Sequence, residues 1–416
     1  MPGSQRQVAP GAGPQLYAEE PQTAVQTPTA VYRDPNLRII FAVTLIAVLG
    51  VSSVTPAFPT MQRSLGITPQ ATGLLITVFT LPGVVATPVL GMMADHVGRK
   101  RILVPSLFLF AAAGTALPLA GSMDLMLLLR FLQGLGAAAL GSLNVTIIGD
   151  LYSGRRCTAA MGYNASVLSV GTAAYPAIGG ALASLGWRYP FFLPVVAIPV
   201  GLLVLFRLDS PEPLTHQGLR QYLADAFISV TNRRIGGLFL ASLATFIIIY
   251  GAYLAYFPFL LADSFGGSSL VIGLIMSSMS ITTALVSSQL GRLVRRSSER
   301  SLIVVAFLLY AAAMTLIPLV PSLWLFIVPA TIFGLAQGIN VPSIQSLLAR
   351  LAPPQHRGAF MSLNGMVLRL GQTLGPVIMG GAYAAWGMVG VYRTGAAVAL
   401  LAAVIVGYTV RAGRGE

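Results

Sequence analysis

Residues 91–101 read Gly-Met-Met-Ala-Asp-His-Val-Gly-Arg-Lys-Arg, a charged stretch that lies between two long apolar runs. A shorter charged stretch, Gly-Arg-Leu-Val-Arg-Arg at residues 291–296, occupies the matching place 200 residues later. A charged segment that recurs at a fixed offset between apolar runs indicates that a membrane-embedded unit has been duplicated. The two stretches therefore predict a helical membrane protein built of two similar halves.

The composition supports a chain that is embedded in lipid. Of the 416 residues, 55% are hydrophobic and 9% are charged, whereas a soluble domain carries about 25% charged residues. The apolar runs are continuous, which excludes a membrane β-barrel with its strands of about ten alternating residues. A spanning helix needs about 20 apolar residues, and the sequence predicts twelve such helices, at residues 38–60, 70–91, 102–121, 125–149, 158–184, 189–207, 235–261, 268–290, 301–320, 323–349, 359–383 and 389–410.

We therefore predict an all-α membrane protein whose twelve transmembrane helices form two six-helix pseudo-repeats. The N-terminal bundle is expected at residues 35–207 and the C-terminal bundle at 235–410, with a polar cytosolic connector at 208–234. Residues 1–34 are rich in Gln, Pro, Ala and Gly and are expected to form a disordered cytosolic tail, and 411–416 a short cytosolic one.

Several glycine, proline and asparagine positions repeat between the halves at one offset. Parallel repeats of this kind predict a pseudo-twofold axis along the membrane normal and a cavity between the halves near the midplane. The pairs that are 200 residues apart include Gly66 and Gly266, Gly73 and Gly273, Asn164 and Asn364, Pro176 and Pro376, and Gly180 and Gly380.

The net charge of +13 is distributed unevenly along the chain. With a cytoplasmic N-terminus, twenty basic residues fall in inner segments, and only Arg63, Arg188 and Arg393 fall in outer ones. This is the positive-inside asymmetry of an inserted protein, so the charge requires no nucleic-acid partner. We expect a multi-pass protein of the inner (cytoplasmic) membrane, surrounded by the lipid bilayer, monomeric and with both termini in the cytoplasm.

The first charged stretch resembles the signature of the major facilitator superfamily, Gly-x-x-x-Asp-x-x-Gly-Arg-Lys/Arg. Gly91, Asp95, Gly98, Arg99 and Lys100 match it, and the likeness in organisation extends from about residue 35 to 410. The resemblance implies a transporter with a fold of two six-helix domains.

It also implies that Asp95, Arg99 and Asp150 form a cytosolic cluster that latches the two halves when the cavity faces outward. The alternative is that these charges only fix the topology. In the second half Arg295 stands at the position of Asp95, so we expect an asymmetric latch.

The fifth predicted helix carries a pattern similar to the motif of proton-coupled drug antiporters in this superfamily. One departure is Tyr175, which stands where the motif has a glycine. Small residues let helices pack backbone to backbone and a proline bends the helix, so plain helix packing remains an alternative reading. The pattern consists of Gly162, Gly171, Pro176, Gly179 and Gly180.

The deep parts of the predicted helices contain no acidic residue, but they contain two arginines. Arg369 lies about 18 Å into the eleventh helix, near the midplane, and either faces the cavity or binds buried structural partners. Arg130 lies about 9 Å from the outer end of the fourth helix and either faces the cavity or snorkels outward. A neutral-to-positive cavity suits neutral or anionic cargo better than cations.

Neutral polar side chains near these arginines are further candidates for the cavity wall. Their alternative roles are interhelical hydrogen bonding for the amides and membrane-interface placement for the tyrosine. They are Gln133, Asn144, Asn164, Tyr253, Gln337, Asn340 and Asn364.

No enzyme signature, metal-ligand cluster or nucleotide-binding Walker loop is present in the sequence. We expect a secondary transporter with no bound cofactor, driven by the proton gradient. The leading hypothesis is proton-linked export of small lipophilic, neutral or weakly acidic compounds by alternating access. The alternatives are an importer or exchanger of a nutrient anion or sugar that uses Arg369 and Arg130 as ligands, and a receptor or scaffold that does not transport.

Overall fold

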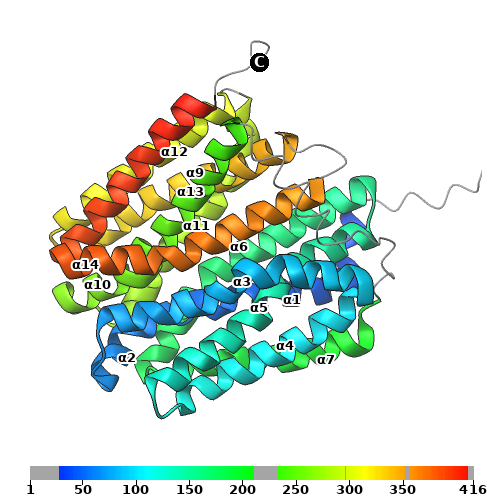
Figure 1. The fold of residues 1–416 in the computed structure, drawn as a ribbon, viewed down its shortest axis with the longest axis horizontal. Helices are drawn as coiled ribbons and strands as arrows, with labels where there is room; N and C mark the ends of the chain where they lie inside the picture. Colours follow the sequence, from blue (N-terminus) through cyan, green and yellow to red (C-terminus); the bar gives the residue numbers. More distant parts are fainter. Residues whose placement is uncertain (1–27, 210–232, 296, 352–356, 411–416) are drawn as a thin grey trace, which may run out of the picture.

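The computed structural model describes residues 28–209, 233–295, 297–351 and 357–410, and within these ranges all regular structure is helical (Figure 1). The first half contains seven α-helices, and short 3-10 turns extend several of them. They are α1 (Pro35–Ser52), α2 (Phe58–Leu65), α3 (Pro69–Val97), α4 (Arg99–Ala116), α5 (Met123–Leu151), α6 (Gly154–Leu185) and α7 (Ala197–Arg207).

The second half repeats this order. Its helices α9 and α10 are joined by a π-helical segment, η5 (Ile248–Tyr256), which makes one long rod. The α-helices are α9 (Arg233–Ile247), α10 (Phe257–Phe265), α11 (Ser269–Val294), α12 (Glu299–Leu316), α13 (Ile327–Leu351) and α14 (Arg357–Thr409).

Eleven helical segments of the described chain are long and apolar enough to cross a membrane. The last of them, Leu363–Thr409, has 47 residues, more than twice the length of about 20 residues that one crossing needs. It is interrupted at Gly387, whose φ of 64° and ψ of −160° are not helical. The predicted count of twelve therefore depends on dividing α14 at this glycine.

The duplication is visible at the helix ends. Gly66 ends α2 and Gly266 ends α10, both in the left-handed conformation with φ of 65° and 64°, which glycine adopts without the penalty of a Cβ. Two residues later in each half, a hydroxyl caps the next helix: Thr68 accepts the N–H of Ala71, and Ser268 accepts that of Val271.

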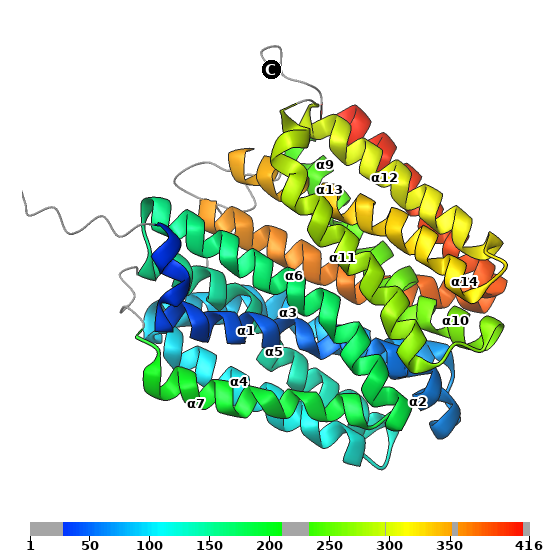
Figure 2. The ribbon, with the colours of Figure 1, turned by 180° about the vertical axis from the view of Figure 1, so that it is seen from behind.

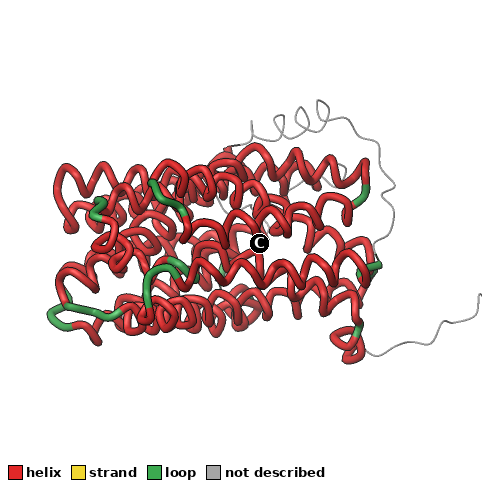
Figure 3. Tube along the Cα trace, turned by 90° about the horizontal axis from the view of Figure 1, so that it is seen from below, coloured by secondary structure: helices red, strands yellow, loops and turns green. Residues whose placement is uncertain are grey.

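The two halves lie side by side and meet along two seams (Figures 1 and 2). Helix α3 packs along α14, and α6 packs along α11, so each seam joins one helix of each half. Figure 3 shows the rods lying alongside one another with short loops between them. The cavity described below lies between these seams.

The prediction of a disordered tail over residues 1–34 is wrong for its last part. Residues Pro28–Arg33 form a 3-10 helix, η1. In it Val31 is only 2% exposed and the ring of Tyr32 contacts that of Tyr163 on α6. Asp34 then caps α1 by accepting the N–H of Asn36. Residues 1–27, the connector from 210 to 232 and the tail at 411–416 lie outside the described residues.

Candidate functional site

A cavity of about 980 Å³ lies between the two halves, lined from α1, α3, α5 and α6 on one side and from α9, η5, α11, α13 and α14 on the other. Its wall includes Asp95, His96 and Arg99, so it reaches the end of the bundle that carries the first charged stretch. We call this end the mouth end and the opposite end the closed end. Of the predicted polar candidates, the wall contains Asn144, Asn164, Tyr253, Gln337, Asn364 and Arg369.

At the closed end the halves touch with almost no space between their backbones. A Cβ placed on Gly273 of α11 would lie 2.2 Å from the carbonyl oxygen of Pro176 on α6. A Cβ placed on Gly180 would lie 2.3 Å from the carbonyl oxygen of Ser269. Only glycine fits at such distances, and the two contacts close the α6–α11 seam.

The α3–α14 seam repeats this arrangement at the offset of 200 residues. A Cβ on Gly73 would lie 3.6 Å from Pro376, the counterpart of the contact between Gly273 and Pro176. Farther out, Arg63 on α2 and Asp263 on α10 form an ion pair of 2.9 Å between the halves.

The remaining glycines of the fifth-helix pattern have different surroundings. A Cβ on Gly179 would lie 1.7 Å from the carbonyl oxygen of Ser53, and one on Gly171 would lie 2.9 Å from Leu45, so both pack α6 against the segment of α1 and η2 (Thr55–Ala57). A Cβ on Gly162 would meet no atom within 4 Å. The pattern therefore mixes seam contacts, contacts within the first half and one open position.

The three residues of the predicted cytosolic cluster are in contact at the mouth end. Arg99 lies 2.5 Å from Asp95 and 2.6 Å from Asp150. These two ion pairs join the ends of α3, α4 and α5. Gly98, with φ of 103°, makes the turn that puts Arg99 at the start of α4, and a Cβ on Gly91 would have no neighbour within 4 Å. The cluster lies wholly within the first half, so its role as a latch between the halves stays a prediction.

The second half carries a matching cluster with the charges reversed. Glu299 pairs with Arg350, and the two are 200 residues after Arg99 and Asp150. Ser346 also donates to Glu299 at 2.9 Å. Arg295 stands at the position that corresponds to Asp95. The first half therefore has an acid, a base and an acid at the three positions, and the second half has a base, an acid and a base. Applying the offset to Arg99 and Asp150 would have revealed this pair in the sequence.

Arg130 and Gln133 do not line the cavity, which corrects two of the candidate assignments. Arg130 is 2% exposed and donates to the carbonyl oxygen of Gly50 at 2.9 Å and to Gln133 at 3.0 Å. Its guanidinium lies over the rings of Phe79 and Phe191, at 5.5 and 5.1 Å from their centroids. It neither reaches the cavity nor snorkels, because carbonyl, amide and aromatic partners solvate it inside the first half.

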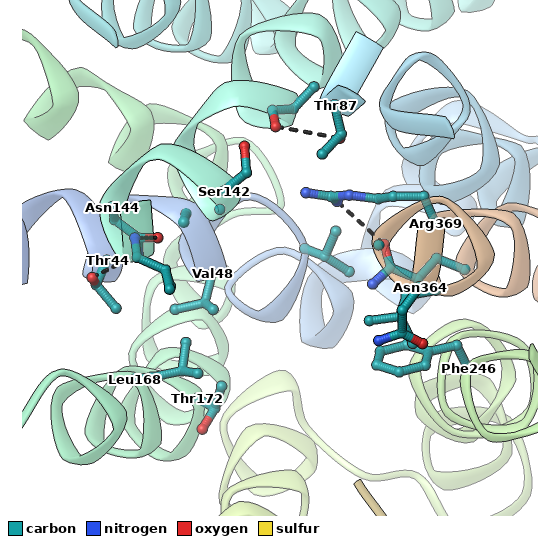
Figure 4. Close-up of a pocket in the computed structure, with 18 of the residues that line it drawn as sticks. Thr44, Val48, Thr87, Ser142, Asn144, Leu168, Thr172, Phe246, Asn364 and Arg369 are labelled. Atoms are coloured by element: carbon teal, nitrogen blue, oxygen red, sulfur yellow. Dashed lines mark hydrogen bonds between the residues drawn. The ribbon is translucent and has the colours of Figure 1, made fainter. Parts of the chain in front are cut away.

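The asparagines on the first side of the cavity join helices. Thr44 on α1 donates to Asn164 on α6 at 2.6 Å and accepts from Asn144 on α5 at 2.9 Å. These bonds hold three helices of the first half together at the cavity wall. Figure 4 shows Thr44 beside Asn144 there. The two amides thus combine interhelical bonding with a position on the cavity surface.

The second half has equivalent bonds. Ser242 on α9 donates to Asn364 on α14 at 3.2 Å, and Asn340 on α13 donates to Thr245 on α9 at 2.6 Å. Asn340 is fully buried and is not in the cavity wall, so its assignment as a cavity residue is corrected to that of a helix-joining residue. Gln337 does line the cavity.

Tyr253 is packed more tightly than a cargo ligand would be. Its ring stacks between Phe257 and Phe333, with centroids 4.9 and 4.7 Å away, and its hydroxyl donates to the carbonyl oxygen of Met276 at 3.4 Å. The residue belongs to the π-helical segment η5, an irregularity that often occurs at functional sites. It forms part of the wall while its ring and hydroxyl have protein partners.

Arg369 reaches from α14 into the cavity (Figure 4). Its Nη1 donates to Gln372 at 3.2 Å, one turn farther along the same helix. The side chain passes Gly83 on α3, where a Cβ would lie 3.0 Å from the Arg369 Cδ, and it ends 3.6 Å from the Cβ position of Gly141 on α5. The cavity thus has a guanidinium at depth, placed there by glycines of the opposite half.

Comparison with known proteins identifies the family. The family model described as Major Facilitator Superfamily matches residues 40–266 and 238–415, which together cover most of the chain. The chain belongs to the major facilitator superfamily. The family makes the chain a multi-pass membrane transporter rather than an enzyme, as the motif at residues 91–100 implied.

Relatives in this superfamily are similar over most of their length. Multidrug resistance protein 2 of Bacillus subtilis is 25% identical over 351 residues, 82% of this chain and 87% of the relative. The class D tetracycline resistance protein of Salmonella ordonez is 24% identical with the same coverages. A solved structure of the nucleoside transporter NupG superposes with a TM-score of 0.74 over 91% of this chain and 100% of NupG, at 15% identity, and thereby supports the fold.

Proposed function

We propose that this chain exports small lipophilic compounds that are neutral or weakly acidic, by proton-linked alternating access across the inner membrane. The observation that carries the proposal is the large cavity between two duplicated halves, open toward the mouth end and closed by glycine contacts at the other. Its relatives named for multidrug and tetracycline resistance favour export of lipophilic compounds over nutrient uptake.

The chemistry of the wall supports this cargo class. Among the described residues of the wall, Asp95 is the single carboxylate, and it lies at the mouth end in an ion pair with Arg99. The deeper wall is apolar or neutral-polar apart from Arg369. Such a surface offers no negative partner to an organic cation, whereas it can bind apolar bodies that carry a few polar groups.

The charged clusters at the mouth end are suited to a gate. Asp95, Arg99 and Asp150 sum to one negative charge, and Arg295, Glu299 and Arg350 sum to one positive charge. Clusters of opposite sign on the two halves attract when the halves approach at this end, and that approach closes the mouth. By the positive-inside rule the mouth end is the cytosolic end, so the described state accepts cargo from the cytosol.

Within the described parts of the chain, one carboxylate both lines the cavity and belongs to the gate, namely Asp95. We assign proton coupling to this carboxylate because protonation removes its charge from the cluster and weakens its ion pair with Arg99. The ion pair with Arg99 and the proton therefore compete for the Asp95 carboxylate.

The test is substrate-evoked proton movement in proteoliposomes that contain the purified protein and a pH-sensitive dye. We expect a neutral lipophilic compound to move protons in the opposite direction, and Asp95→Asn to abolish the proton signal. Asp124→Asn, an exposed carboxylate at the opposite end of α5, is the matched control and should behave like the unaltered protein. Cargo uptake with no proton flux in the unaltered protein would contradict the proton-linked mechanism.

A further inference from the structure

We propose that Arg369 binds the negative group of an organic monoanion, so that the preferred cargo of the cavity is an anion with an apolar body. This inference rests on the proposed function, because it names the cargo class of the same cavity. It narrows that class from neutral or weakly acidic compounds to those that carry a full negative charge when they bind.

The position of Arg369 is set by the seam between the halves. Next to it, Thr77 and Thr80 on α3 contact Thr373 on α14 at 3.2 and 3.0 Å, which holds the two helices together. One turn nearer the mouth the seam opens, and the Arg369 side chain passes over Gly83 into the cavity. The guanidinium therefore lies where the closed α3–α14 seam meets the open cavity, well inside the mouth.

The guanidinium has donor capacity left over. It carries five N–H groups, and one hydrogen bond to a side chain, Gln372, is made among the described residues. The ion pairs of the described chain involve other residues, and none reaches Arg369. A cation without a counter-charge at membrane depth is unfavourable, and an anionic cargo supplies the missing charge.

The other charges of the wall are distant and already paired. Asp95 is twelve residues from Gly83 along α3, a rise of about 18 Å, and it is bound to Arg99. An anion that enters the mouth meets one accessible positive group at depth. The planar fork of an arginine pairs two donors with the two oxygens of a carboxylate or sulfonate, which favours these groups over a halide.

The rest of the cavity suits the apolar part of such a cargo. Aromatic and aliphatic side chains from both halves line the same cavity as the guanidinium, among them Phe79, Phe246, Ile249, Leu254 and Met276. A volume of about 980 Å³ accommodates a drug-sized molecule. Arg369 can neutralise one negative charge of the cargo. A dianion would bring a second negative charge into the cavity with no further cation among the described residues of the deep wall to neutralise it, so a monoanion is favoured.

The competing explanation is structural. By passing Gly83 and Gly141 of the first half, Arg369 could serve only to join the two halves. That role would make its loss harmful to every cargo equally, whatever the charge. A set of three probes with the same ring and different charges separates the two explanations.

The probes are 1-naphthalenesulfonate, its neutral sulfonamide and the 1-naphthyltrimethylammonium cation. Binding to the purified full-length protein in detergent is measured by equilibrium dialysis, and transport is measured in proteoliposomes. We expect Arg369→Gln to weaken sulfonate binding by ~10-fold or more, as for loss of a charge-assisted hydrogen-bonded pair, and to change sulfonamide binding by less than about twofold. Arg393→Gln, an exposed arginine on the last helical segment, is the matched control and should change neither.

Arg369→Lys decides the question if Arg369→Gln does not fold. It keeps the charge and loses the fork, so we expect an intermediate loss for the sulfonate alone. Equal losses for sulfonate and sulfonamide, absence of sulfonate binding to the unaltered protein, or preference for the cation would each overturn the inference. Transport of the sulfonamide with no sulfonate binding would overturn the inference and leave the proposed function standing. Sulfonate binding that depends on Arg369, without transport of any probe, would support the inference and contradict the proposed function.

Discussion

Substitution of one glycine at the closed end is expected to shift the protein toward the state that is open there. A Cβ at Gly273 would lie 2.2 Å from the Pro176 carbonyl oxygen and 3.2 Å from the Cα of Ala177. Both are backbone atoms, so no side chain can rotate away. In the Gly273→Ala variant, α11 and α6 must separate by about 1 Å to restore ordinary contact.

The magnitude follows from the cost of overpacking, which is about 1–3 kcal/mol in a well-packed interior. The cost applies only to the state in which the seam is closed, because the added methyl meets no backbone once the two helices separate at this end. The equilibrium between the two states should therefore shift about 5- to 150-fold toward the state in which α6 and α11 have separated at this end.

The shift is measurable by the distance between two spin labels. Ser64 and Ser264 are exposed residues near the ends of α2 and α10, one in each half, and they are 200 residues apart. With the single cysteine removed as Cys157→Ser, labels at these sites report the separation of the halves by electron–electron double resonance. In Gly273→Ala, we expect a longer distance to gain population relative to the parent.

The matched control is Gly162→Ala on α6, where the added methyl has no neighbour within 4 Å. Its distance distribution should equal that of the parent. If Gly273→Ala folds and leaves the distribution unchanged as well, then the glycine contacts do not hold the closed end, and the reasoning is refuted.

Three further substitutions test separate parts of the structure through thermal unfolding in detergent. Arg130→Gln should lower the stability by about 2–3 kcal/mol, since a carbonyl and two ring faces lose the guanidinium; an unchanged melting temperature would argue against its buried structural role. Glu299→Gln should cost about 1 kcal/mol or more by depriving Arg350 of its carboxylate, and an unchanged melting temperature would contradict a stabilising role of this pair. Gly387→Ala places a Cβ on a residue with φ of 64° and ψ of −160° and should cost about 1–3 kcal/mol, whereas Gly381→Ala, with open space around it, should be neutral.

The sequence was most informative about features that depend on local composition and on the duplication. Long apolar runs predicted the spanning helices because the thickness of the bilayer fixes their length. The shared offset predicted that Gly66 and Gly266 are equivalent, and both end their helices with the same left-handed geometry. The cluster of Asp95, Arg99 and Asp150 was predicted from the motif and is in contact.

The sequence was less informative where a helix end meets another part of the chain. The composition of residues 1–34 indicated disorder, yet Val31 and Tyr32 pack against the bundle and Asp34 caps α1. Glycine spacing indicated a single motif in α6, but contacts across the seam distinguish Gly180 from the unoccupied surroundings of Gly162. Spacing along one helix does not say which neighbour each glycine meets.

The two deep arginines show most clearly what each level decides. Arg130 is followed by Gln133 and Arg369 by Gln372, so both helices present an arginine with a glutamine one turn later in an apolar segment. Both arginines hydrogen-bond to that glutamine. By itself the sequence determined that two cations lie in apolar, membrane-spanning segments, each with a glutamine three residues later.

Only the tertiary structure decided that they differ in environment. Arg130 points into the first half, where Phe79, Phe191 and a backbone carbonyl surround it, while Arg369 passes Gly83 into the cavity between the halves. The reason is geometric, since the face of a helix that meets a cavity depends on how it is rotated against neighbours from distant parts of the chain. Apolar content sets where a helix lies in the bilayer, but packing between the halves sets which of its residues can touch cargo.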